Sequence, residues 1–435
     1  MAQFRIDTHK YLGDGKTIFE VGMLNDRFTS SGTAADAFGR LRVSNPLTLF
    51  ESVHRYQINE KFATNTSGTA NTQYQVNESV VDMNIGTTSG DKCIRESKRV
   101  FAYQPGKSLL IMNTFVFNTQ KTNVRQRVGY FNANNGVFFE NDGTGNYLVL
   151  RSYVTGSVVE TRISQSDWNK DKFDGTGASS QTGHANRGSL DITKANIFWI
   201  DIEWLGVGDV RCGFVVDGLM IPAHVFHNDN INTTTYMTTA VLPVRYEIEN
   251  TGTSGSASKL KQICSTVISE GGYTLEGRSR SVSIPITTPI DLPTAGTFTP
   301  IISIRLKDSF KDAIAILKDV EFFGTTNNTS YRYKIIIGGT LTSASWQSAG
   351  TDSSVEYDIS ATAVTGGRDA QIGYVNVSAG AGGTAVNLSG DQLFAYQLER
   401  DGFAVSNNGI IITLAGTGAA NGNDAVGAMT WQEIT

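Results

Sequence analysis

The feature that most constrains the fold is a period-two alternation of apolar side chains, clearest in residues 197–218, IFWIDIEWLGVGDVRCGFVVDG. Successive side chains of a β-strand point to opposite faces, so this period predicts strands with one buried face. A turn at 206–209 and an Asp-Gly pair at 217–218 interrupt it, and glycine accepts the positive φ of such turns. Apolar residues fill alternate positions on both sides of the first turn: Phe198, Ile200, Ile202 and Trp204, then Val210, Cys212, Phe214 and Val216. We expect a β-meander here.

The same pattern recurs upstream. Residues 128–163 divide into four short apolar runs separated by turn residues at 134–136, 142–145 and 155–156, and residues 108–119 form another run. The chain holds 45 Gly and only 8 Pro, which suits short strands joined by tight turns. Regular short strands predict an all-β fold, with an antiparallel β-sandwich or jelly roll over residues 41–280.

The residue pattern of the sequence changes after residue 280. Residues 281–300 hold four of the eight prolines and are predicted to form an extended linker or an entry strand. Strand patterns return over 301–435, which we expect to form a second, smaller β-sandwich. Residues 308–319 fit a short helix as well as a strand. Residues 1–40 are polar and are predicted to be an arm that docks on a partner; the alternative is a first strand and loop of the same domain.

Bulk composition excludes several classes of protein. The 435 residues carry a net charge of −5, with 18% charged side chains, so no basic surface for nucleic acid is predicted. Three widely spaced cysteines, Cys93, Cys212 and Cys264, indicate free thiols in a reducing compartment. The sequence shows neither the apolar stretch of a signal peptide nor an apolar run of about 18 residues. We expect no membrane partner and synthesis in a cytoplasm.

Known catalytic patterns do not fit. The PGKS at 105–108 has Phe101 where a phosphate loop needs glycine. No nucleophile elbow or dinucleotide fingerprint occurs. His224 and His227, three apart on an expected strand, would point to opposite faces and are interpreted as surface or interface residues. Cys93 has basic neighbours but no assignable base. The sequence therefore assigns no catalytic residue, no cofactor and no metal site.

Acidic residues leave two alternatives open. Glu140, Asp142, Asp201 and Glu203 are expected at strand ends or edges, where two facing carboxylates would be needed for glycoside hydrolysis. The turns at 140–146 and 171–177 have oxygen ligands that suit Ca²⁺, although turn chemistry explains them without a metal.

Five long stretches carry a resemblance to a known family: residues 36–52, 95–108, 164–177, 197–218 and 236–250. In the same order, they resemble virion structural proteins of tailed bacteriophages, including marine phages and cyanophages. The resemblance implies a lectin-like, concanavalin-type jelly roll, a place in the virion after synthesis in the host cytoplasm, and other virion proteins as partners. No catalytic residue comes with it.

Four functions compete. The first is a non-enzymatic structural protein, a homo-oligomer (trimer or hexamer) attached to the tail, neck or baseplate as a fibre or collar-like part. The second is head decoration. The third is recognition of a host-surface glycan through exposed aromatics and Asp-rich turns, with Trp168, Trp199, Tyr153 and Asp174 as candidate contacts. The fourth is a depolymerase.

Overall fold

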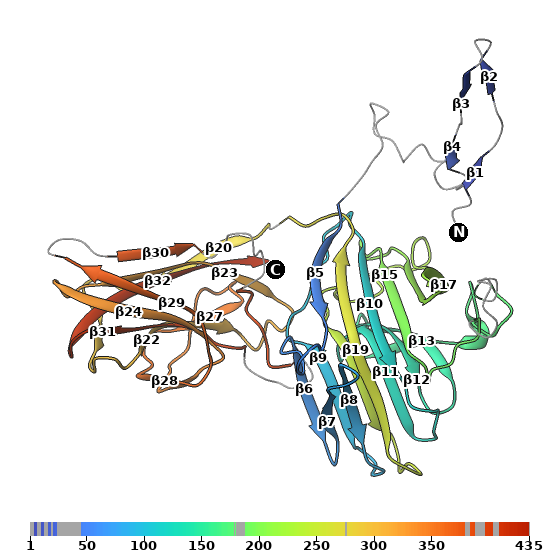
Figure 1. Cartoon of the computed structure of the whole chain (residues 1–435), viewed down its shortest axis with the longest axis horizontal. Helices are drawn as coiled ribbons and strands as arrows, with labels where there is room; N and C mark the ends of the chain where they lie inside the picture. The colour runs from blue at the N-terminus through green and yellow to red at the C-terminus, as the bar shows by residue number, and fades with distance from the viewer. Residues whose placement is uncertain are drawn as a thin grey trace. The chain divides into compact units, whose positions relative to one another are not determined.

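The structure, a computed structural model, describes residues 4–6, 10–12, 16–18, 21–23, 45–177, 179, 188–274, 276–378, 383–387, 396–402 and 409–434. The prediction of an all-β fold is confirmed: in these ranges the only helix is the single 3-10 turn η1 (Gln165–Asp167) (Figure 1). Every strand pair recorded there is antiparallel. The chain separates into two compact units, Met1–Pro46 and Leu47–Thr435.

The first unit contains β1 (Phe4–Ile6), β2 (Lys10–Leu12), β3 (Lys16–Ile18) and β4 (Val21–Met23). β1 pairs with β4 and β2 with β3, so one short ladder is nested inside the other. Most of the predicted arm, residues 1–40, lies outside the described residues.

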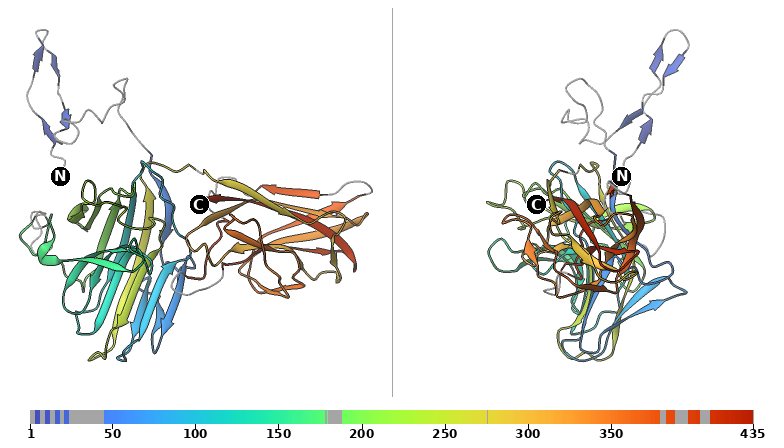
Figure 2. Two further views of the ribbon diagram at one scale, coloured as in Figure 1. Left: turned by 180° about the vertical axis from the view of Figure 1, so that it is seen from behind. Right: turned by 90° about the vertical axis from the view of Figure 1, so that its left-hand side faces the viewer.

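The larger sandwich is built from two sheets. The first has the order β17-β16-β15-β10-β19-β8-β7, and β5 also pairs with β19. Its strands are β5 (Leu47–Ser52), β7 (Asn71–Gln75), β8 (Val80–Ile85), β10 (Leu109–Val116), β15 (Asn196–Ile202), β16 (Val210–Val216), β17 (Leu219–Phe226) and β19 (Ser258–Ser269). β5 and β19, far apart in sequence, lie side by side in Figures 1 and 2.

The second sheet of this sandwich has the order β14-β13-β12-β11-β18-β9-β6. Its strands are β6 (Phe62–Ser67), β9 (Lys92–Ser97), β11 (Val124–Phe131), β12 (Gly136–Asn141), β13 (Asn146–Ser152), β14 (Val159–Ser164) and β18 (Val244–Asn250). The strands β11 to β14, consecutive in sequence, are neighbours in this sheet, which follows from the tight turns seen in the sequence, whereas β18, β9 and β6 come from more distant segments.

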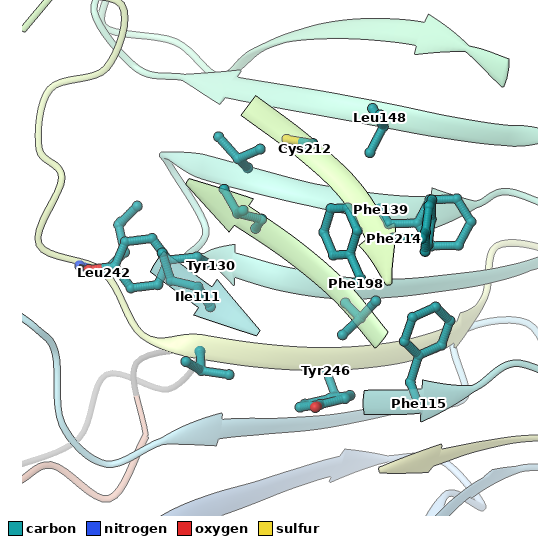
Figure 3. Packing of buried hydrophobic residues seen from close by; sticks show 14 of the residues in the cluster. Ile111, Phe115, Tyr130, Phe139, Leu148, Phe198, Cys212, Phe214, Leu242 and Tyr246 are labelled. Carbon is teal, nitrogen blue, oxygen red and sulfur yellow. Dashed lines mark hydrogen bonds between the residues drawn. The ribbon is translucent and has the colours of Figure 1, made fainter. Parts of the chain in front are cut away.

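The core of the larger sandwich lies between its two sheets. The predicted meander is confirmed as β15 and β16, where Phe198 pairs with Phe214 and Ile200 with Cys212. All four side chains are at most 1% exposed. The ring of Phe139, from the opposite sheet, lies 5.9 Å from Phe198 and 5.2 Å from Phe214 (Figure 3). The alternating apolar faces thus meet in one aromatic-rich core, and Cys212 packs there as a small apolar residue.

The second sandwich also has two sheets. A five-stranded sheet of order β20-β32-β23-β30, with β21 on β32, contains β20 (Arg278–Ser283), β21 (Ile290–Leu292), β23 (Ile314–Gly324), β30 (Gly383–Asn387) and β32 (Asn423–Ile434). A six-stranded sheet of order β26-β27-β22-β31-β24-β29 contains β22 (Thr299–Leu306), β24 (Thr329–Ile337), β26 (Gln347–Ser348), β27 (Val355–Asp358), β29 (Arg368–Val377) and β31 (Ile412–Gly418). β25 (Thr340–Thr342) pairs with β28 (Ala363–Thr365). Trp431 and Leu414, both 0% exposed, belong to its core.

Two expectations about this region need correction. The extended linker predicted for residues 281–300 is wrong and the entry-strand alternative is confirmed: the segment completes β20, forms β21 and begins β22, and both β20 and β21 pair with β32. The helical alternative for 308–319 is wrong, because β23 starts at Ile314 and pairs with β32. Residues 314–317 are all buried, and a strand covered on both faces shows a continuous apolar run that periodicity alone does not separate from a helix.

Candidate functional site

A cleft of about 500 Å³ opens at the rim of the larger sandwich. It lies where the edge strand β17 of one sheet approaches β13 and the edge strand β14 of the other. We call it the rim cleft. It is lined by Leu150, Ser152, Val154, Thr155, Thr161, Asn169, His224, Val225, Phe226, His227, Asn228, Asn232, Thr233, Thr234, Thr235 and Tyr236.

The lining of the rim cleft combines apolar and hydroxyl groups. Leu150, Val225 and Phe226 are buried and contribute apolar surface. Thr161, from β14, and Thr233 to Thr235, from the loop after β17, are exposed. Within the described residues, none of these four hydroxyls bonds to another protein group. Apolar surface beside a few convergent polar groups is the usual make-up of a small-molecule site.

Asn169 fixes one wall of the cleft. Its Nδ2 donates to the Val225 carbonyl at 2.9 Å, and its Oδ1 accepts from the Val225 N–H at 2.9 Å. Its own backbone N–H donates to His224 Nδ1 at 3.2 Å. These bonds occupy backbone groups that an edge strand leaves unpaired and tie β17 to the segment after η1.

Both histidines border the rim cleft, contrary to the expectation that they point to opposite faces. His224 lies within β17, whereas His227 follows the end of that strand at Phe226, so strand alternation no longer applies to it. His224 is 7% exposed and packs edge-to-face on Phe226, with ring centroids 4.7 Å apart. Burial, helped by His227 and Lys170, lowers the pKa of His224 to about 4. The exposed His227 places Nδ1 2.9 Å from Asp209 Oδ2.

Of the four predicted glycan contacts, Tyr153 is 36% exposed and does not itself line the rim cleft, although its sequence neighbours Ser152 and Val154 do. Asp174 is exposed but does not line the cleft. Its Oδ1 accepts hydrogen bonds from the N–H and hydroxyl of Thr176, at 3.0 and 2.6 Å. These bonds hold the pKa of Asp174 below its usual range.

The expectation that the two tryptophans are exposed is wrong. Trp168 is 2% exposed, lies in the core with Phe173 and Phe214, and donates from Nε1 to the Ile163 carbonyl at 3.2 Å. It thereby anchors the segment that carries Asn169. Trp199 is 4% exposed and lies over Gly213, where a Cβ would come within 2.7 Å of the indole.

The four acidic residues are not brought together, since two belong to each sheet of the sandwich. Glu140 lies inside β12 rather than at an end, is fully buried, and accepts a 2.6 Å bond from Arg127 Nε. Arg162 pairs with both Glu140 and Asp142. In the other sheet Asp201 pairs with Arg211, while Glu203 is exposed. Burial raises the pKa of Asp201 to about 6 despite Arg211.

Two properties of the described residues bear on cofactors and membranes. No three side chains of His, Cys, Asp or Glu gather there in a way that would hold a metal ion. The turn aspartate Asp142 accepts hydrogen bonds from Thr144 and Gly145, which accounts for its place in the turn.

Among the described residues, no helix has the length and apolar character needed to cross a membrane. Burial raises the pKa of the Cys93 thiol to about 12, which opposes a nucleophilic role.

Sequence reasoning missed the threonines of the rim cleft. Residues 232–236, Asn-Thr-Thr-Thr-Tyr, have only a polar loop composition, which is common between strands. They become a wall of the cleft because Asn228 donates from Nδ2 to the Gly208 carbonyl at 2.9 Å, and Asn232 donates to Asn228. These bonds fold the loop back toward β16.

No family model matches the chain, and no curated protein matches it. Solved structures match about half of it. A Bacillus licheniformis β-glucanase is 9% identical over 52% of this chain and 99% of its own, with a TM-score of 0.32. A Bacteroides ovatus mixed-linkage glucan GH16 protein is 10% identical over 50% and 99%, with a TM-score of 0.32. The CBM2 module of an evolved Dit of Lactobacillus casei BL23 phage J-1 is 6% identical over 54% and 100%, with a TM-score of 0.31. These low scores carry no argument about function.

Proposed function

We propose that this chain is a non-catalytic structural protein of a tailed-phage virion whose larger sandwich binds a host-surface glycan in the rim cleft. The observation that carries the glycan role is the lining of the cleft, where four unbonded threonine hydroxyls lie beside buried apolar side chains. A sugar presents both C–H surfaces and hydroxyl groups. The apolar side chains of the lining can contact the former, and the threonine hydroxyls can bond to the latter. Tyr153, an exposed aromatic residue next in sequence to the lining residues Ser152 and Val154, is proposed as a further glycan contact.

The place in a virion rests on the resemblance of residues 36–250 to virion structural proteins. In this proposal the chain acts as a homo-oligomer at the tail, neck or baseplate, and residues 1–40 dock on other virion proteins. A repeated weak glycan site gains avidity in a symmetric assembly, which suits a shallow cleft. The lining residues of the rim cleft include no Asp or Glu within the described part of the chain, which supports binding without turnover.

The experiment is a titration of the full chain with a panel of host-surface glycans. Thr161→Trp should weaken binding at least about tenfold, because a large ring then occupies the cleft from β14. Thr288→Trp is the matched control: it makes the same exchange at an exposed threonine of the second sandwich and should leave affinity unchanged. Equal affinity in both variants, or hydrolysis of the bound glycan, would overturn the proposal.

A further inference from the structure

The outer face of the six-stranded sheet carries an arginine held between two aromatic rings. Arg332 on β24 is paired in register with Tyr374 on β29. Its guanidinium carbon lies 5.3 Å from the Tyr374 ring centroid and 5.4 Å from that of Phe298. Tyr374 is 72% exposed, and a hollow of about 270 Å³ borders both Arg332 and Tyr374. We call Phe298, Arg332 and Tyr374 the aromatic-arginine platform.

The charge of Arg332 is not neutralised by the described protein. No carboxylate of the described residues forms an ion pair with it, and its Nε is buried without a hydrogen-bond partner there. Arg305 in the same sheet shows the contrast, since it stacks on Trp346 at 4.0 Å and also bonds to Glu356 at 2.6 Å. The guanidinium charge is therefore not offset by a carboxylate of the described residues, so an anion that approaches Arg332 from the hollow would be stabilised.

The platform also has the groups that a sugar needs. The exposed ring of Tyr374 offers a flat face for stacking. Ser330 and Asn376, two register pairs further along the same two strands, are both exposed and hydrogen-bonded to each other at 2.6 Å. They can exchange that bond for bonds to sugar hydroxyls. Lys334, two residues from Arg332 on the same face, is paired with Asp369 at 2.6 Å.

We propose that the aromatic-arginine platform is a second ligand site, at which Arg332 binds the carboxylate or sulfate group of an acidic sugar stacked on Tyr374. This goes beyond the proposed function, because the site lies on the other sandwich and does not depend on the rim cleft. A nucleic acid fits less well: it needs a track of cations along several phosphates, and here Asp369 neutralises Lys334, which leaves Arg332 as the unpaired cation of the platform among the described residues.

The test measures binding of the full chain to polygalacturonate, to a sulfated galactan and to neutral dextran. We expect binding to an acidic polysaccharide, weakening as salt is raised, and no binding to dextran. Preference for polygalacturonate identifies the carboxylate, and preference for the galactan identifies the sulfate. No binding to either acidic polysaccharide, equal binding to dextran, or tighter binding to a single-stranded oligonucleotide would overturn the proposal.

Variants assign the binding to the platform. Arg332→Gln and Tyr374→Ala should each weaken it about tenfold or more, whereas Tyr374→Phe, which keeps the ring, should retain it. Arg278→Gln removes the same charge from an exposed position on β20 of the other sheet and should have no effect. Equal losses in Arg278→Gln and Arg332→Gln would mean unspecific charge attraction and contradict the assignment. Because Tyr374 is exposed, its two variants decide the question even if Arg332→Gln fails to fold.

Discussion

The side-chain amide of Asn169 and the backbone of Val225 bond to each other in both directions, each bond being 2.9 Å long. This pair joins the segment after η1 to the edge strand β17 and so sets one wall of the rim cleft. The first prediction follows from it. Asn169→Ala should lower the free energy of unfolding by about 2 kcal/mol, because two bonds are lost and edge groups of β17 are left unpaired. Denaturant unfolding measures the loss.

Asn71→Ala is the control for this variant. Asn71 is exposed and its side chain bonds only to the side chain of Asn84 among the described residues, at 3.2 Å. A change within about 0.5 kcal/mol is expected there. Equal effects at Asn71 and Asn169 would contradict the role given to the Asn169–Val225 pair.

The second prediction separates a buried from an exposed aromatic residue among the four predicted glycan contacts. Trp168→Ala should cost about 3–5 kcal/mol of stability, since it leaves a cavity among Phe139, Phe173 and Phe214. Tyr153→Ala, at an exposed position, should change stability by no more than about 0.5 kcal/mol while weakening glycan binding. Unfolding curves and titrations of both variants test this. A stable Trp168→Ala protein with weakened glycan binding would contradict the buried placement.

The third prediction concerns the buried ion pair of the seven-stranded sheet. Arg127 is 5% exposed and Glu140 is not exposed at all. Glu140→Gln removes the negative charge that faces both Arg127 and Arg162, so it should cost about 3 kcal/mol or more. Glu356→Gln also removes a carboxylate that bonds to an arginine, at the half-buried Arg305, and should cost less, about 1 kcal/mol. Denaturant unfolding of both proteins compares them, and the reverse order would contradict the burial argument.

The fourth prediction is a pH dependence. The pKa of His224 is lowered from 6.5 to about 4, so between these values the unfolded chain binds more protons than the folded one. Its contribution to stability is therefore complete above about pH 6.5 and is lost as the pH falls through 4. His224→Asn should reduce the fall in stability between pH 7 and 4 by about 2 kcal/mol. Unfolding followed at several pH values measures the slope, and an unchanged slope would exclude His224 as its source.

The sequence could predict the elements whose one face is buried. In 197–218 the alternation of Phe198, Ile200 and Cys212 and the turn at 217–218 predicted strands, a hairpin and the inward side chains, all of which the structure contains. It could not separate strand from helix in 308–319, because Ile314 to Leu317 are buried on both faces of β23. The alternation of apolar and polar side chains is then absent, and the strand is recognised only from its pairing with β32.

The candidate site was less predictable, and the reason is also physical. The sequence predicts Trp168 and Trp199 to be exposed, because a sequence pattern can indicate that a side chain faces outward or inward but not what covers it. The rim cleft is lined by β13, β14, Asn169 and the loop after β17. These segments lie far apart in the sequence, from Leu150 to Tyr236. Only the strand order, which brings the edges of two sheets together, places their side chains around one cleft.

The central claim, that this chain is a structural part of a virion, is tested most directly by its copy number per particle. Quantitative mass spectrometry of purified virions, referenced to the major capsid protein, gives that number. The account predicts tens of copies or fewer, in a multiple of three or six, as expected for a symmetric oligomer on the tail, neck or baseplate. Hundreds of copies would instead support decoration of the head, and absence of the chain from virions would contradict the claim.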